Sequence, residues 1–253
     1  MSGNVELFTT RMRKATRKIH SVSDALVNAK FAIGKYFYNF EQISLQDETV
    51  WGGGLFVFYH IFAFLEDAKE RLNDPDFNKL FVHTILYRKR AFQEDLDHYL
   101  GKDWHSLPKS IPLESYLQHL QDLEVDSPQL LMAYVYHLYL GLLSGGQILA
   151  KKRRMFGDKN DKPDAYVDKV TDFSEIDISQ LKNDFRAAMN EIADNMSEKE
   201  KNAFIEESNM VFGMNNLAVN AIGGQNRVLK SYFYKASAIL VLVFGAVLAY
   251  KMR

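Results

Sequence analysis

Residues 138–152 read LYLGLLSGGQILAKK, and this stretch holds three glycines within six positions, at Gly141, Gly145 and Gly146. Its flanks are patterned as helix, and each glycine inside a helix costs about 1 kcal/mol relative to alanine. Gly141 and Gly145 are four residues apart, so they share one helix face. A face without side chains lets a flat molecule press against the backbone, and the helix can bend there. Close packing of two helices uses the same small-residue spacing, so both interpretations stay open on the glycines alone.

The rest of the chain is also patterned as helices. Apolar residues recur at helical spacing in residues 10–35, 51–72, 77–100, 113–124, 128–156, 178–194 and 198–228. Ser197 with Glu200 is a typical helix start, and Pro128 suits the first turn of another helix. The chain has only five prolines and no clean alternation of apolar and polar residues. We therefore expect an all-α fold, a single compact bundle of about seven helices with one long loop at 157–179.

Composition sets the broad class. The chain has 253 residues, 47% of them hydrophobic, which suits one globular domain with an appendage. It contains no cysteine, which excludes disulfides, thiolate metal sites and cysteine nucleophiles. The 31 basic and 32 acidic residues leave a formal net charge of −1, so the overall charge gives no reason to expect nucleic acid as a partner.

The C-terminal residues 232–250 read YFYKASAILVLVFGAVLAY. A helix of this length spans about 28 Å, close to the hydrocarbon thickness of a bilayer. Aromatic residues at both of its ends are typical of membrane interfaces. We expect a C-terminal transmembrane helix that serves as a tail anchor, so that 1–227 is the helical domain and 228–253 the membrane anchor. A buried C-terminal helix is the alternative.

A second group of residues lies near the N-terminus. Arg13, Arg17 and His20 have i, i+4, i+7 spacing, which places them on one side of a helix. A single histidine on a helix is usually structural, and a run of charges is usually a solvated face. A neutral imidazole can nevertheless ligate iron, while cations beside it can pair with carboxylates. Heme contains both an iron atom and two carboxylates in one molecule.

These stretches together resemble the heme oxygenase family. LYLGLLSGGQILAKK is similar to the family's distal helix, which carries a YLGDLSGGQ-type segment, and RKATRKIH at 13–20 resembles its proximal helix. Three more stretches resemble family segments, namely FVFYHIFAFLEDAKERL at 56–72, QLKNDFRAAMN at 180–190 and EESNMVFGMNN at 206–216. A further family segment is matched by Arg88, Phe92, Asp95 and Leu96. The similarity runs in order over roughly residues 10–225, and the family also ends in a tail anchor.

The resemblance implies a role for each matching residue. His20 would be the proximal iron ligand, and Gly141 and Gly145 the distal contacts whose flexibility opens and closes the pocket. Tyr59 and Asn215 would be the remaining polar catalytic residues. The heme-binding residues would be Arg13, Arg17, Tyr136, Ser144, Gly146, Lys182, Arg186 and Phe212, of which Arg13, Arg17, Tyr136, Lys182 and Arg186 would steer the propionates.

The resemblance also implies a reaction and partners. Heme would be both substrate and cofactor, and O₂ with electrons from NADPH would open it to biliverdin, CO and free iron. An NADPH-dependent cytochrome reductase would dock on a basic surface that includes Lys151, Lys152, Arg153 and Arg154, although cations at a helix C-terminus also complement the helix dipole. Biliverdin reductase is a further expected partner. The expected location is the endoplasmic reticulum membrane, with the catalytic domain facing the cytosol.

One position departs from the family pattern. Vertebrate and bacterial members typically carry Asp after the first glycine, where this chain has Leu142, and Leu138 replaces a neighbouring family arginine. In the family that carboxylate orders distal water and favours attack on the heme ring, whereas leucine displaces water. Insect heme oxygenases provide the nearest pattern with an uncharged residue there. The sequence therefore predicts slow turnover with mixed biliverdin isomers.

Two other functions remain open at this point. A heme-binding sensor or buffer on the membrane, without oxygenase activity, would share His20 and the glycine-rich helix and would explain Leu142 directly. A tail-anchored helical interaction protein would need no cofactor.

Overall fold

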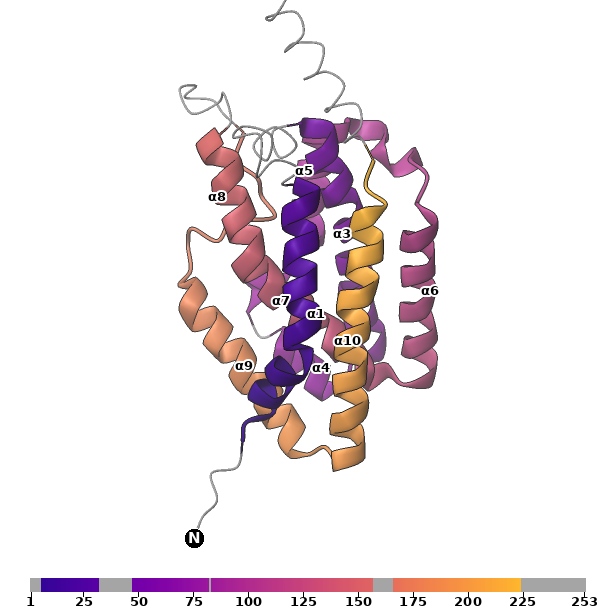
Figure 1. Ribbon diagram of the computed structural model, residues 1–253, viewed down its shortest axis with the longest axis vertical. Helices are drawn as coiled ribbons and strands as arrows, with labels where there is room; N and C mark the ends of the chain where they lie inside the picture. The colour runs from indigo at the N-terminus through magenta and orange to yellow at the C-terminus, as the bar shows by residue number, and fades with distance from the viewer. Residues whose placement is uncertain (1–5, 32–46, 82, 157–165, 224–253) are drawn as a thin grey trace, which may run out of the picture. The chain divides into compact units, whose positions relative to one another are not determined.

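The computed structural model describes residues 6–31, 47–81, 83–156 and 166–223, and within these ranges its regular structure is helical (Figure 1). The described residues up to Ile222 form one compact unit. The α-helices are α1 (Phe8–Phe31), α3 (Glu48–Leu72), α4 (Pro75–Leu80), α5 (Lys89–Leu100), α6 (Ile111–Asp126), α7 (Leu131–Gly141), α8 (Gln147–Phe156), α9 (Ile178–Asp194) and α10 (Glu198–Asn220). Shorter helical turns are η1 (Thr84–Leu86), η2 (Lys102–Ser106), η3 (Pro128–Leu130) and η4 (Leu142–Gly146). The expected all-α bundle is confirmed.

The centre of this unit is built on α3 and α7. Helix α7 is buried along most of its length, including its tyrosines Tyr134, Tyr136 and Tyr139. Helices α1 and α10 lie side by side although they are far apart in sequence, and α6 packs against α3 and α10 (Figure 1). Helix α9 packs against α1, α4 and α7. This arrangement brings α1, α7, α9 and α10, which carry most of the expected site residues, into contact.

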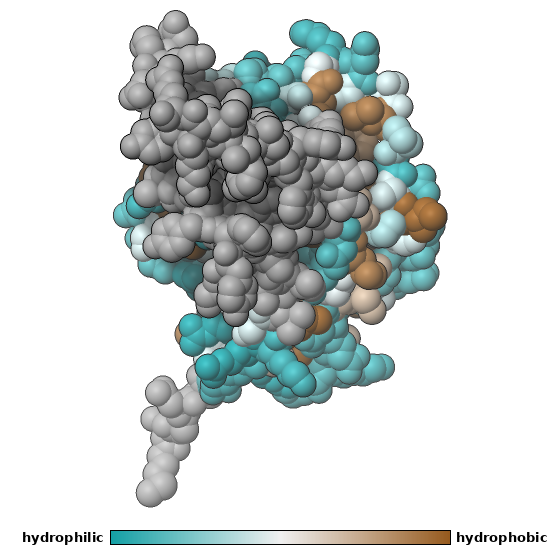
Figure 2. All heavy atoms as spheres, turned by 45° about the horizontal axis from the view of Figure 1, so that its top comes forward, coloured by the Kyte–Doolittle hydropathy of each residue, from teal (hydrophilic) through white to brown (hydrophobic). Residues whose placement is uncertain are grey.

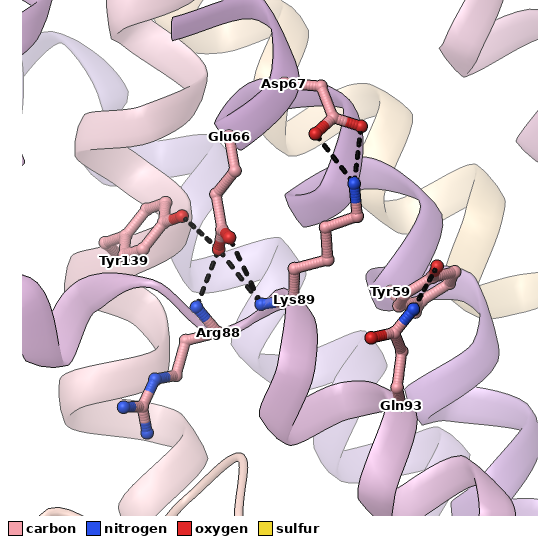
Figure 3. Close-up of polar contacts among 7 residues, drawn as sticks. All are labelled: Tyr59, Glu66, Asp67, Arg88, Lys89, Gln93 and Tyr139. Carbon is pink, nitrogen blue, oxygen red and sulfur yellow. Dashed lines mark hydrogen bonds and ion pairs between the residues drawn. The ribbon is translucent and has the colours of Figure 1, made fainter. Parts of the chain in front are cut away.

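The expected helix over residues 77–100 is interrupted. Helix α4 ends at Leu80, the turn η1 follows, and α5 begins only at Lys89. The cause is the buried carboxylate of Glu66 on α3, which accepts the backbone N–H groups of Arg88 at 2.7 Å and Lys89 at 3.2 Å (Figure 3). It also accepts a hydrogen bond from the Tyr139 hydroxyl at 3.1 Å. The Glu66 side chain thus satisfies the free N–H groups at the start of α5 from another helix.

The expected helix over 128–156 is divided by the π-helical turn η4, which contains Gly145 and Gly146. Such turns are rare inside helices and occur often at functional sites. The start of α10 agrees with the sequence prediction, since Ser197 and Glu200 form a reciprocal capping box. Helix α10 ends at Asn220, before the expected 228.

The predicted anchor at 228–253, with residues 232–250 at its centre, lies outside the described residues. Among the described helices, α3 is long and apolar enough to cross a membrane, but 61% of its most apolar window is buried inside the unit. Helix α3 is therefore a core helix. On the face seen in Figure 2, the described residues are mostly hydrophilic, with hydrophobic residues standing alone or in small groups.

Candidate functional site

Two histidines contact the same aromatic ring between three helices. The ring of Phe212 on α10 lies 5.2 Å from the imidazole of His20 on α1, centroid to centroid. It lies 5.0 Å from the imidazole of His137 on α7, and both contacts are edge-on at 61°. His20 and Phe212 were expected at the site, and the structure brings them together. His137 was not expected, because a histidine within an apolar helix carries no distinctive sequence signal.

His137 is half-buried, but its Nε2 is buried and has no hydrogen-bond partner among the described residues. Burial, and secondarily the neighbouring His20, lowers the pKa of His137 to about 3. The imidazole is therefore neutral at physiological pH, and its Nε2 is a hydrogen-bonding atom that no described residue uses. An unpaired buried polar atom of this kind costs on the order of 1–3 kcal/mol.

The glycine-rich stretch lines open space. Gly141 and Gly145 are exposed, and a Cβ atom added at either would meet no described atom within 4 Å. The same holds for Gly213, which follows Phe212 on α10. Gly146 differs, because a Cβ there would lie 3.0 Å from Cδ1 of Leu142. The bare backbone at Gly141 and Gly145 thus serves no close helix–helix contact in the described structure, which leaves the approach of a flat ligand.

Cationic side chains gather beside this open face. Burial raises the pKa of the Tyr136 hydroxyl to about 12, while neighbouring Arg186, Thr9 and Arg13 act in the opposite direction. The Tyr136 hydroxyl therefore lies near both Arg13 of α1 and Arg186 of α9. Lys182, one turn before Arg186, places its Nζ 3.4 Å from the Ser144 hydroxyl of η4.

Arg17 is exposed on α1 between Arg13 and His20, at the expected spacing. Of the five groups expected to bind carboxylates, Arg13 and Arg186 lie near Tyr136, and Lys182 lies near Ser144. Arg17 is on the same helix as Arg13, and the helices that carry all five groups contact one another. The positive charges of the arginine and lysine side chains suit an anionic ligand.

Asn215 belongs to a polar pair that the sequence did not reveal. The hydroxyl of Tyr116 on α6 donates to Oδ1 of Asn215 at 2.9 Å. Tyr116 is completely buried, and this burial raises the pKa of its hydroxyl well above the usual value. The partners are 99 residues apart and Tyr116 fits an ordinary apolar helix stripe, so nothing in the local pattern could have identified the pair.

Tyr59 lies in a different environment. Its hydroxyl accepts a hydrogen bond from Gln93 at 3.3 Å (Figure 3), and its ring lies 4.8 Å from Trp104. It lines a cavity of about 300 Å³ together with His60, Ala63, Phe64, Asp67, Lys89, Trp104, His105, Leu117 and Gln121. The hydrogen-bond and ring partners of Tyr59 in the described structure are Gln93, His60 and Trp104, and Asn215 is not among them.

The basic run at the end of α8 is only partly on the surface. Lys151 and Arg154 are exposed and Lys152 is half-buried. Arg153 points inward, with its side chain 12% exposed and its guanidinium 5.2 Å from the Trp51 ring and 4.7 Å from the Tyr99 ring. It also pairs with Asp168 at 3.6 Å. The prediction that Arg153 belongs to a docking surface is therefore wrong, because its cation is held inside the protein.

Comparison with known proteins identifies the family of the chain. The chain matches the family model described as heme oxygenase over residues 6–221. Heme oxygenase 1 of Nostoc sp. is 30% identical over 159 residues, which make up 62% of this chain and 65% of that protein.

Among solved structures, heme oxygenase 2 from Chlamydomonas reinhardtii, crystallised without heme, is 31% identical with a TM-score of 0.74, covering 86% of this chain and 98% of that one. Heme oxygenase-1 from Synechocystis sp., solved in complex with heme, shares the fold with a TM-score of 0.72 at 23% identity, covering 96% and 100% of the two chains. The chain therefore belongs to the heme oxygenase family of enzymes.

The residues present fit heme as a ligand. Open space beside the backbone of Gly141 and Gly145 suits a flat ring, and the nearby cations suit its two carboxylates. The described ranges contain no cluster of three or more His, Asp or Glu side chains that could hold a metal ion. Iron at this site would thus depend on the porphyrin for most of its ligands.

Proposed function

We propose that this chain catalyses the oxidative opening of heme to biliverdin, CO and free iron, with O₂ and with electrons that NADPH supplies through a reductase. The observation that carries the proposal is the position of His20 and Phe212 beside a helix whose Gly141 and Gly145 face is bare. A flat, anionic, iron-containing ligand matches the histidine, the open backbone and the cations at once.

Each residue has a distinct task in this proposal. Nε2 of His20 binds the iron, and Phe212 packs against the His20 ring and limits its rotation. Arg13, Arg17 and Arg186 hold the propionates, with Tyr136 and Lys182 beside them, and so set which ring edge faces the distal side. The bare backbone at Gly141, Gly145 and Gly146 admits the ring closely, with Ser144 at its edge. Heme, when bound, supplies the iron that activates O₂ and the ring that is opened.

The distal side is apolar at the position where the family pattern has a carboxylate. Leu142 leans toward Gly146, and Leu138 is buried, so neither orders water. The remaining polar pair is Asn215 with Tyr116. We therefore propose slow turnover with relaxed choice of the cleaved ring position, a pattern that resembles insect heme oxygenases.

Electrons would enter near the end of α8. Lys151, Lys152 and Arg154 form the surface proposed for the acidic face of the reductase, without Arg153. Attraction between exposed charges weakens as salt screens it. Reductase-driven turnover should therefore fall with rising ionic strength, while turnover driven by ascorbate should not. Biliverdin reductase would consume the product.

The second candidate function is a heme sensor or buffer that binds heme and leaves it intact. Leu142 favours it, because a protein that only binds heme needs no distal water network.

One experiment separates the two functions. Hemin is added to the purified full chain, and reductase with NADPH or ascorbate is then supplied in air. Loss of the Soret band with formation of biliverdin and CO supports the enzyme, whereas an unchanged hemin spectrum supports the sensor or buffer. Absence of a defined Soret spectrum on hemin addition would contradict both.

The proposed location is the endoplasmic reticulum membrane, with residues 228–253 as the anchor and the catalytic domain in the cytosol. The sequence supports this through the apolar run at 232–250. Protease added to intact microsomes should digest the helical domain, and a chain ending at Arg227 should be released from the membrane fraction. Protection of the domain, or membrane retention of the shortened chain, would contradict the proposal.

A further inference from the structure

We propose that His137 is a positioning residue for His20, and that its Nε2 accepts a hydrogen bond from Nδ1–H of His20 when the other nitrogen of His20 binds iron. This inference rests on the proposed function, since it concerns how the iron ligand is held.

The first observation is the unused nitrogen of His137. Its Nε2 is buried and lacks a partner among the described residues. Buried polar atoms in folded proteins are nearly always paired, and each exception calls for an explanation. An atom that is unpaired in the ligand-free protein and paired in the loaded one provides such an explanation.

The second observation is the common contact with Phe212. The imidazoles of His20 and His137 both meet the edge of this ring, at 5.2 and 5.0 Å. The two imidazoles are also close enough that a charge on His20 acts on His137. His137 lies one turn before Gly141 on α7, so it stands at the end of the bare face.

The third step is chemical. A histidine that binds a metal through one ring nitrogen almost always donates its other N–H to a hydrogen-bond acceptor, which fixes the tautomer and the ring plane. A neutral imidazole has one acceptor nitrogen, and at His137 this nitrogen is unused. A neutral acceptor withdraws the proton of His20 less than a carboxylate does, so His20 remains a neutral imidazole ligand.

A rival acceptor follows from the sequence. Asp24 comes one helical turn after His20, and its side chain lies outside the described part of the structure. The variant Asp24→Asn therefore belongs in the test beside the His137 variants.

The test compares His137→Leu, His137→Gln and Asp24→Asn in the full chain in detergent, loaded with hemin and reduced under CO-free nitrogen. Resonance Raman spectroscopy measures the iron–histidine stretch of each complex, and a hemin titration measures affinity. Leucine removes the acceptor at similar volume, whereas the glutamine amide retains one. The loss of such an outer partner typically weakens metal binding about 10- to 100-fold.

We expect His137→Leu to move the stretch to lower frequency and to weaken hemin binding about tenfold. His137→Gln should retain most of the stretching frequency and of the hemin affinity of the unmodified chain. Asp24→Asn should leave the frequency unchanged. An unchanged frequency in His137→Leu, or a shift confined to Asp24→Asn, would overturn the inference.

Failure of the proposed function gives a different result. If the unmodified chain forms no hemin complex, or forms one without an iron–histidine band that depends on His20, then the proposed function fails and the inference fails with it. Thermal unfolding of the ligand-free variants shows whether His137→Leu folds normally.

Discussion

Two half-buried histidines, His137 and His60, invite direct comparison. The Nε2 atom of each is buried without a hydrogen-bond partner in the described structure. Burial is the main reason that the pKa of His137 falls to about 3 and the pKa of His60 to about 4. By these measures alone, the two residues are equally good candidates for a ligand-binding histidine.

Their surroundings differ. His137 stands near His20, the bare backbone of Gly141 and the cationic side chains around Tyr136. His60 lines the cavity that also contains Trp104, Lys89 and Asp67, and in that cavity Lys89 pairs with Asp67 at 2.7 Å (Figure 3). The charges that act on His60 itself are those of Lys109 and His105. A cation acts on each histidine, so the feature that distinguishes His137 is the bare glycine backbone one helical turn after it.

The largest expected effect comes from filling the open face near His137. Gly145→Leu should weaken hemin binding by more than about 100-fold, because the leucine side chain occupies the space proposed for the heme ring. The ligand-free protein should lose no stability, since leucine is about 1 kcal/mol more favourable than glycine in a helix. Hemin titration and thermal unfolding measure the two quantities. Tight hemin binding by a folded Gly145→Leu protein would place the ligand elsewhere.

A third buried group, Asp95, is fully paired and gives a pH effect of known sign. It accepts the backbone N–H groups of Lys169 and Val170 and the Tyr166 hydroxyl, yet burial raises its pKa to about 6. A carboxyl whose pKa is raised on folding contributes stability below its unfolded pKa, and this contribution is lost as pH rises through the folded pKa.

The free energy of unfolding attributable to Asp95 should thus fall by about 2 kcal/mol between pH 4 and pH 6. Urea unfolding of the unmodified chain and of Asp95→Asn across this pH range isolates the contribution of Asp95. The contributions of the other titrating groups cancel in the difference between the two free energies of unfolding. A constant difference between the two proteins would show that the carboxyl titrates normally.

Restoring a distal carboxylate should accelerate the reaction. Leu142→Asp should raise coupled turnover on the order of tenfold, a modest part of what a positioned proton donor can provide. It should also narrow the biliverdin isomers toward one. Chromatography of the biliverdin product measures its amount and its isomer composition. Leu142→Asn serves as the uncharged control. Fast turnover to a single isomer in the unmodified chain would show that Leu142 is harmless.

The matched pair His137→Leu and His60→Leu tests the comparison itself. Each removes an unpaired buried nitrogen, so each should leave the ligand-free protein as stable as before or more stable by about 1 kcal/mol. Only His137→Leu should weaken hemin binding. Equal hemin affinities in the two variants would mean that their surroundings do not matter.

The smallest effect is expected at Tyr59. Tyr59→Phe removes one hydrogen bond of 3.3 Å to Gln93 in the aromatic cavity, so turnover should stay within about twofold and stability within about 1 kcal/mol. Tyr116→Phe is the counterpart, because it leaves Oδ1 of Asn215 without its donor. A larger loss of turnover in Tyr59→Phe than in Tyr116→Phe would support the catalytic role that the sequence predicts for Tyr59.

Features carried by local sequence were predictable. The bounds 178–194 agree with α9, and the capping box at Ser197 marks the start of α10. Periodicity and capping act over a few residues, so one chain reveals them. The position of the glycine-rich turn followed from composition, although its π-helical form did not.

Features that depend on distant partners were not predictable. The break before α5 requires Glu66 from another helix, and the inward position of Arg153 requires Trp51 and Tyr99. The pairing of Tyr116 with Asn215 and the site position of His137 have the same origin. These contacts join residues far apart in sequence and leave no local pattern.

The most direct test of the account is the iron–histidine stretch of the ferrous heme complex in the unmodified chain, His20→Ala and His60→Ala. We predict a band that His20→Ala abolishes and His60→Ala leaves unchanged, because the proposed heme site lies between α1 and the bare face of α7 and η4. A band that survives in His20→Ala, or disappears in His60→Ala, would contradict the assignment of the site.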